Sequence, residues 1–256
     1  MRAPARAAMR DPSLASEHSP DAVRHRLSVP PRTSYLRDFI YGAIDGAVTT
    51  FAVVAGVAGA KLSPTVLLIL GGANLIADGF SMAVSNFLGL RAERQQLELA
   101  RQEEERHVSL VPEGEREEIR QIFAAKGFEG ADLDRVVEVI TADRDLWVST
   151  MLSEELGLGA TAPDPLRAGA TTFLAFITVG FFPLAAYVFD AIAPGGLDHA
   201  LAWSAAMTAA AFFAVGSLKA RFVEQAWWRA GLETLAVGGS AAALAYAAGA
   251  LLERLV

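Results

Sequence analysis

TVLLILGGANLIADGFSMAVSNFLGL, residues 65–90, is long and apolar enough to cross a bilayer, yet it carries an acid near its middle. About twenty apolar residues in a helix span a hydrocarbon core of roughly 30 Å. Further windows of this kind cover residues 39–60, 168–189, 200–218 and 230–252. Because a lipid-exposed backbone has to satisfy its own hydrogen bonds, these windows predict helices. We therefore expect an all-α membrane protein with five transmembrane helices.

The composition indicates a second, water-exposed part of the chain. Of its 256 residues, 53% are hydrophobic and 20% are charged, which fits neither an ordinary soluble domain nor a bundle buried wholly in lipid. Most of the acids lie between the second and third windows. We therefore expect a disordered tail at residues 1–35, transmembrane helices 1–2 at 36–90, a helical metal-binding domain at 91–166 and transmembrane helices 3–5 at 167–256.

Basic residues near the ends of the windows set the expected orientation. They precede the first window and separate the fourth from the fifth, whereas the loop DAIAPGGLDH after Phe189 has no Lys or Arg. The N-terminus and residues 91–166, the insert between the second and third windows, are therefore expected to be cytoplasmic. The bias of the chain toward Ala and Arg favours a bacterial plasma membrane as the location of this multi-pass protein.

Charge and cysteine content restrict the partners. The chain has no cysteine, so any metal has to be held by oxygen, imidazole or thioether groups. The net charge of −7 argues against a nucleic-acid partner, because phosphate binding needs a basic surface. A cation partner is therefore favoured.

Two acids lie inside the first two windows. An acid in a hydrocarbon span is costly and indicates a functional site. Asp45 lies in the first window, and the second has polar or thioether side chains every four residues, on one helix face: Asn74, Asp78, Met82 and Asn86. Carboxylate combined with thioether favours first-row ions over Mg²⁺ or Ca²⁺, so Fe²⁺, Mn²⁺, Co²⁺ and Zn²⁺ remain. A packing role for Met82 and a hydrogen-bonding role for Asp78 also remain open.

The same carboxylates can bind protons. A metal ion that binds to them would displace those protons. Proton-coupled antiport is therefore a hypothesis that the two membrane acids suggest.

The insert carries pairs of metal-binding residue types at helical spacing. Its first helix is expected to continue the second window without a break as far as His107, and further helices are expected from Pro112, Ala131 and Asp143. Residues three or four apart share a helix face. The pairs are Glu104 and His107, Glu115 and Glu118, and Met151 and Glu155. Their convergence would form a carboxylate-rich metal site, although acidic helices are also commonly just solvated surfaces.

Motifs from separate parts of the chain resemble the vacuolar iron transporter family. They are YGAIDGAVTTFAVVAGVAGA at 41–60, NLIADGFSMA at 74–83, ELGL at 155–158, FFPL at 181–184 and LKARF at 218–222. The resemblance implies a five-span homodimer that exchanges cytosolic Fe²⁺, and sometimes Mn²⁺, for protons. It matches Asp45 and Met82 to the translocation path. It also matches a set of insert residues to the metal ligands of the family: Glu104, Glu115, Glu118, Met151 and Glu155.

Other readings of the sequence are an iron-oxidising protein and a membrane-anchored metal sensor. Glu104-x-x-His107 has the spacing of a ferritin-like di-iron helix, but that design needs two such helices. A simple membrane anchor has no need of Asp45 and Asp78. We therefore expect a transporter without enzymatic activity or a resident cofactor, in which the metal is the cargo.

Overall fold

The computed structural model describes residues 16–28, 34–159, 163–193, 199–221 and 225–255. The chain divides into two compact units, Met1–Ser34 and Tyr35–Val256. Within the described ranges every regular element is a helix. This agrees with the expected all-α fold.

The first unit contains helix α2, Pro20–Ser28. Asp21 in its first turn and Arg26 in its last turn carry charges that complement the helix dipole. We expected no regular structure in the tail of residues 1–35, so this helix is a difference from the sequence-based prediction. The tail residues 1–15 and 29–33 lie outside the described part.

The second unit contains helices that are long and apolar enough to cross a membrane. They are α3 (Leu36–Gly59), α4 (Pro64–Leu110), α10 (Ala200–Ala220) and α11 (Trp227–Glu253). Helices α8 (Pro165–Gly180) and α9 (Phe182–Ile192) meet at an angle of 51° and are long and apolar enough to cross a membrane only when taken together. The described residues thus contain four candidate spans, or five when the bent pair is counted as one.

The break between α8 and α9 was not expected, because the window 168–189 predicted one continuous helix. Phe181 links the two helices, and Pro183 lies in the first turn of α9. Proline lacks the N–H group that a helix interior needs, and its ring fits the first turn of a new helix. The FFPL motif at 181–184 therefore divides the span.

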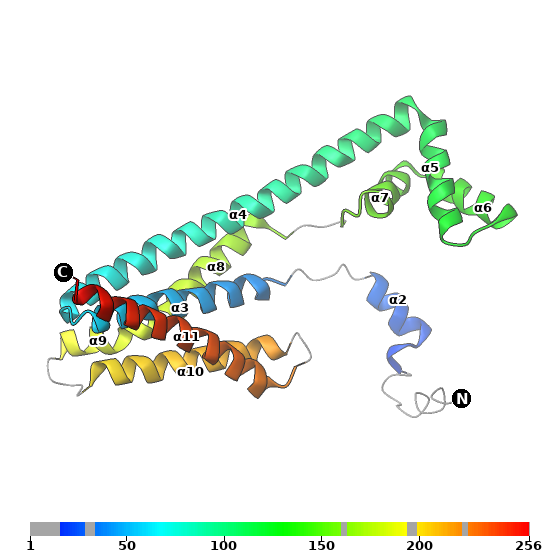
Figure 1. Cartoon of the computed structure of the whole chain (residues 1–256). Helices are drawn as coiled ribbons and strands as arrows, with labels where there is room; N and C mark the ends of the chain where they lie inside the picture. The colour runs from blue at the N-terminus through cyan, green and yellow to red at the C-terminus, as the bar shows by residue number, and fades with distance from the viewer. Residues whose placement is uncertain (1–15, 29–33, 160–162, 194–198, 222–224, 256) are drawn as a thin grey trace. The chain divides into compact units, whose positions relative to one another are not determined.

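Helix α3 lies at the centre of the bundle and packs against α4, α8, α9, α10 and α11 (Figure 1). Gly42 and Gly46 permit its close contact with α8, since a Cβ atom at either would collide with the backbone of Thr172 or Phe176. The small-residue spacing that the sequence shows beside Asp45 therefore serves a contact within one chain.

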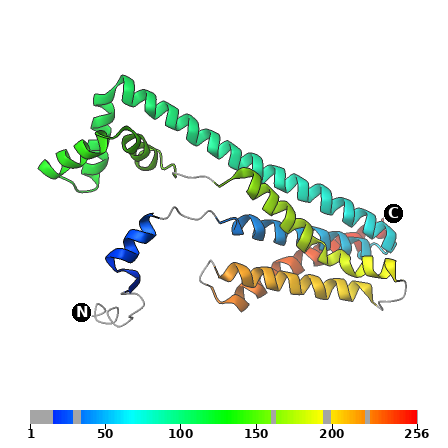
Figure 2. The same ribbon diagram turned by 180° about the vertical axis from the view of Figure 1, so that it is seen from behind.

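Helix α4 is 47 residues long, as the absence of a helix-breaking residue led us to expect. At 1.5 Å per residue it extends about 70 Å, roughly twice the thickness of a hydrocarbon core. Figures 1 and 2 show its first half in the bundle and its second half leading to the insert helices. These are α5 (Pro112–Ala125), α6 (Gly130–Thr141) and α7 (Arg144–Glu154).

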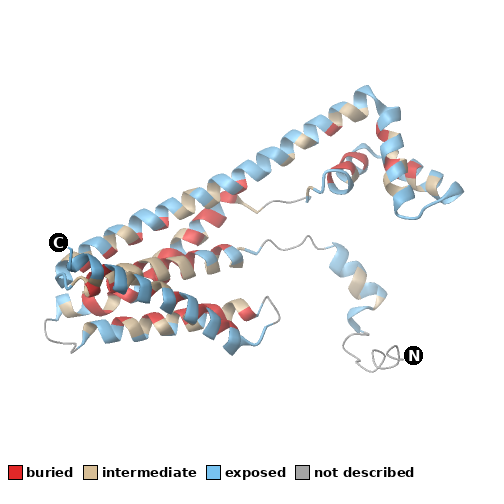
Figure 3. Cartoon of the chain, in the orientation of Figure 1, coloured by how far each residue is buried: buried red, intermediate tan, exposed pale blue. Residues whose placement is uncertain are grey.

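The insert has an apolar core of its own. Helices α5, α6 and α7 all carry buried residues, drawn red in Figure 3, and α6 packs against both α5 and α7. The buried members of this cluster are Ile119, Val137, Ile140, Trp147 and Met151. This core fixes α5 and α7 beside the end of α4 and so positions the polar side chains described next.

Candidate metal sites

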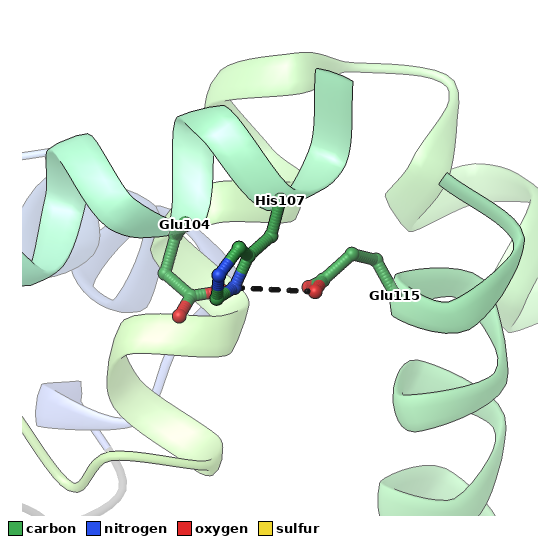
Figure 4. A group of neighbouring side chains, drawn as sticks. All are labelled: Glu104, His107 and Glu115. Atoms are coloured by element: carbon green, nitrogen blue, oxygen red, sulfur yellow. Dashed lines mark ion pairs between the residues drawn. The ribbon is translucent and has the colours of Figure 1, made fainter. Parts of the chain in front are cut away.

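Three of the predicted ligands converge where α4 meets α5. Glu104 and His107 come from one face of α4, and Glu115 comes from the first turn of α5 (Figure 4). One ligand atom from each of the three lies within 4.8 Å of the others. The Nδ1 atom of His107 lies 3.6 Å from a carboxylate oxygen of Glu115. We call these three residues the insert cluster.

Both carboxylates of the insert cluster are withdrawn from water. Glu104 is 5% exposed and Glu115 is 4% exposed. Among the described residues, the Oε2 atom of each has no hydrogen-bond partner. A buried carboxylate oxygen without a partner is costly, so nearly all such groups in proteins are paired. A bound cation would supply the missing partner for both oxygens.

Local sequence explains how Glu115 reaches α4. Helix α4 ends at Leu110, and Pro112 starts α5 in its first turn, where a proline is best tolerated. Ile119, one turn after Glu115, is fully buried in the apolar core of the insert. Because residues four apart share a helix face, burial of Ile119 turns Glu115 inward as well.

Further carboxylates surround the insert cluster. Burial raises the pKa of Glu115 to about 7, and the charges of Glu118 and Glu104 add to the effect while His107 opposes it. The pKa of Glu104 is also raised, chiefly by burial and then by the charge of Glu155. Burial raises the pKa of Glu155, followed by the charge of Glu118. Glu118 and Glu155 therefore lie near the cluster as an exposed acidic rim that attracts cations.

Met151 occupies a different setting from the carboxylates. Its side chain is fully buried in the apolar core that includes Ile119 and Trp147. The structure thus shows a packing role for Met151. Its role as a ligand stays a prediction.

In the spans, Asp45 on α3 and Asp78 on α4 lie near enough for their charges to interact. Asp45 is half-buried and Asp78 is exposed. Asn74 and Met82, one turn to either side of Asp78, are half-buried, and the Nδ2 atom of Asn74 has no partner among the described residues. The structure therefore places Asn74, Asp78 and Met82 along one side of α4, with Asp78 near Asp45 of α3.

A cavity of about 310 Å³ lies where α3 begins, and its lining residues are Arg37, Asp38, Tyr41, Met82, Ser85 and Asn86. The sequence reasoning missed Asp38, which is 5% exposed and accepts a hydrogen bond of 2.9 Å from Nδ2 of Asn86. It lies seven residues, about two turns, before Asp45 and so on the same helix face. That spacing was the signal that could have identified it.

One exposed face of α4 is polar and the opposite one is apolar. Asp78, Ser81 and Ser85 are exposed along the first, whereas Ile76 and Phe80 are exposed along the second. A span surface that faces lipid should be apolar, because an acid at the bilayer centre costs about 3 kcal/mol on insertion scales. The polar face of α4 therefore needs water or a protein partner, and the apolar face suits lipid.

The VIT family model matches residues 36–250. The chain is 34% identical to the vacuolar iron transporter of Toxoplasma gondii, over 88% of this chain and 76% of the relative. It is 33% identical to that of Plasmodium falciparum, over 74% and 72% of the two chains. It is 32% identical to vacuolar iron transporter 1 of Arabidopsis thaliana, over 82% and 83%.

These relatives are eukaryotic, so the comparisons give no support to the bacterial plasma membrane that we expected. The likeness extends over the spans and the insert alike, and it confirms the resemblance noted from the motifs. With its candidate spans, the chain is a multi-pass membrane protein. By the extent of these matches, it belongs to the VIT family, the vacuolar iron transporters.

Proposed function

We propose that this protein is a homodimeric carrier that moves Fe²⁺ out of the cytosol in exchange for protons. The observation that carries the proposal is the pair of buried carboxylates, Glu104 and Glu115, each with an oxygen that lacks a partner. The relatives bear the name of iron transporters, which supports a divalent metal as cargo.

The proposed route begins in the insert. With the N-terminus and the insert on the cytoplasmic side, the insert cluster collects the ion. The ion then enters the cavity lined by Asp38 and Met82 and moves on to Asp45 and Asp78. The distribution of Lys and Arg around the spans supports this orientation.

The exposed polar face of α4 supports a homodimer. In a single chain Asp78, Ser81 and Ser85 lie exposed on this face, whereas the opposite face of α4 suits lipid. Pairing of this face with the same face of a second copy would enclose the acids of both copies and exclude lipid from them. The passage would then run between the two copies.

The ligand types support a first-row ion and a proton counter-flow. Carboxylates, one imidazole and the thioether of Met82 suit Fe²⁺ and leave Mn²⁺, Co²⁺ and Zn²⁺ as further substrates. Carboxylates that bind a metal ion have to release their protons first. Each ion that occupies the Asp45–Asp78 pair would therefore drive protons off it.

Uptake into liposomes that contain the purified protein tests the proposal. We expect Fe²⁺ to accumulate under anaerobic conditions, and to do so faster when the interior is acidic, because protons then leave as metal enters. Equal rates with and without the pH gradient would exclude proton coupling. Metal binding without any uptake would favour the membrane-anchored sensor instead.

A further inference from the structure

His107 is the nitrogen donor of the insert cluster, and its partners there are the carboxylates of Glu104 and Glu115. Its ring lies between Glu104 and Glu115 in Figure 4. An imidazole in this position changes the chemistry of the cluster, because nitrogen and oxygen donors favour different ions.

The spacing of the donors suits direct coordination. Two ligand atoms that share one ion at about 2.1 Å lie about 3.0 Å apart at a right angle and about 3.4 Å apart at a tetrahedral angle. His107 Nδ1 and Glu115 Oε1 are 3.6 Å apart. A shift of a few tenths of an ångström therefore places both atoms on the same ion.

The second ring nitrogen of His107 has a carboxylate on its other side. Its Nε2 atom lies 3.9 Å from Oε1 of Glu103, one turn earlier on α4. Glu103 is exposed and lies outside the insert cluster. A metal-binding histidine commonly gives its other N–H to a carboxylate, which fixes the ring and strengthens the ligand. Small side-chain rotations would bring the Glu103–His107 pair into this arrangement.

We propose that His107, oriented by Glu103, is a direct metal ligand that makes the insert prefer nitrogen-accepting first-row ions over Mn²⁺ and Mg²⁺. The favoured class is Fe²⁺, Co²⁺ and Zn²⁺, for which imidazole is a good ligand, whereas Mn²⁺ and Mg²⁺ suit all-oxygen sites. This inference deepens the proposed function, because it rests on metal collection by the insert and names the selectivity of that step.

Competition between Co²⁺ and Mn²⁺ for the full-length protein in detergent tests the inference without any transport. His107→Glu keeps the number of ligands but replaces nitrogen by oxygen. We expect it to lower the preference for Co²⁺ over Mn²⁺ by about tenfold or more, the loss typical when the surroundings of a metal ligand are changed. His25→Glu makes the same chemical change on exposed helix α2 and should leave the preference unaltered. Glu103→Gln should weaken Co²⁺ binding while the cluster itself stays intact.

Pulsed electron paramagnetic resonance of bound Mn²⁺ gives a direct readout. We expect nitrogen hyperfine coupling in the native protein and in His25→Glu, and its loss in His107→Glu and His107→Gln. The inference is overturned if the coupling is absent from the native protein, if it persists in the His107 variants, or if His107→Glu leaves the metal preference unchanged.

The outcomes separate this inference from the proposed function. A native protein that binds neither ion in the insert would overturn both metal collection and the role of His107. If the protein binds Co²⁺ selectively and shows nitrogen coupling but takes up no metal in liposomes, the transport proposal is overturned and the role of His107 is supported. If His107→Glu does not fold, the coupling in the native protein and in His107→Gln decides the matter.

Discussion

The insert and the spans both carry clustered carboxylates, but the insert cluster is more fully enclosed within one chain than the Asp45–Asp78 pair is. Glu104 and Glu115 are almost fully buried beside α5 and its apolar core, whereas Asp78 is exposed on the surface of α4. If the insert lies outside the bilayer, as we propose, water surrounds it, and one small apolar core can close around a site. In a bilayer an open acid faces lipid unless water or another protein covers it. The difference fits the proposed function, in which the proposed binding site is complete in one copy and the proposed passage needs a second copy.

The largest effect is expected from Asp45→Asn. The change removes the charge from the half-buried acid of α3 and should reduce Fe²⁺ uptake into liposomes by about a hundredfold, because the proposed passage would lose a ligand of the moving ion. Co²⁺ binding by the insert should be unchanged in the same preparation. Asp145→Asn, at an acid whose side chain is 90% exposed, is the control and should transport normally. Normal Fe²⁺ uptake by Asp45→Asn would contradict a role of Asp45 in metal transport.

Glu115→Gln tests the other half of the comparison. It keeps the size of the buried side chain but removes its negative charge, and we expect metal affinity to fall by about 10- to 100-fold. Uptake should fall at low metal concentration and recover at high concentration, because the passage itself is intact. Glu113→Gln changes an acid on the same helix whose side chain is 87% exposed, and it should leave affinity unaltered. Equal losses in the two variants would mean that the cluster acts only through its general negative charge.

Metal affinity measured at several pH values tests the insert cluster further. Burial, together with the charges of Glu118 and Glu104, raises the pKa of Glu115 to about 7. Below that pH the carboxyl is protonated, so an arriving ion has to displace a proton, and above it the ion binds a free carboxylate. Apparent affinity should therefore be about tenfold weaker at pH 6 than at pH 8. Calorimetry in buffers of different ionisation enthalpy measures the released protons. Glu115→Gln should lower the proton release at pH 6, and an unchanged release would contradict the assignment.

The smallest effect concerns the packing that positions Asp45. Gly46→Ala would add a methyl group against the backbone of Phe176 on α8, and overpacking of this kind typically costs roughly 1–3 kcal/mol. Gly72→Ala adds the same group where nothing lies within 4 Å. Thermal unfolding in detergent should separate the two variants. A stable Gly46→Ala would show that α3 and α8 can move apart at little cost.

Much of this architecture could be read from the sequence, because lipid and water demand different side chains. The apolar windows correspond to the spans, and the uninterrupted run from Leu90 to His107 gave the long α4. The bend at Phe181 was missed because the window is apolar throughout, and hydropathy does not register the missing N–H of Pro183. Helix α2 was missed because a polar tail carries no hydrophobic period.

Less of the candidate sites than of the fold could be predicted from the sequence. Helical spacing placed Glu104 and His107 on one face, but only the turn at Pro112 shows that Glu115 reaches them. Asp38 was missed because it lies in the first turn of α3, where acidic residues are common in helices. Spacing also could not show which of the acids are buried, because burial depends on how distant helices pack.

The absence of cysteine allows one direct test of the polar face of α4. Asp78→Cys and Ile76→Cys lie at nearly the same depth but about 200° apart around the helix. Labelling by a membrane-impermeant thiol reagent in liposomes reports which side meets water. We expect fast labelling of Asp78→Cys that Co²⁺ slows, and little labelling of Ile76→Cys. Equal, slow labelling of both would place Asp78 in lipid or dry packing and contradict a hydrated metal passage.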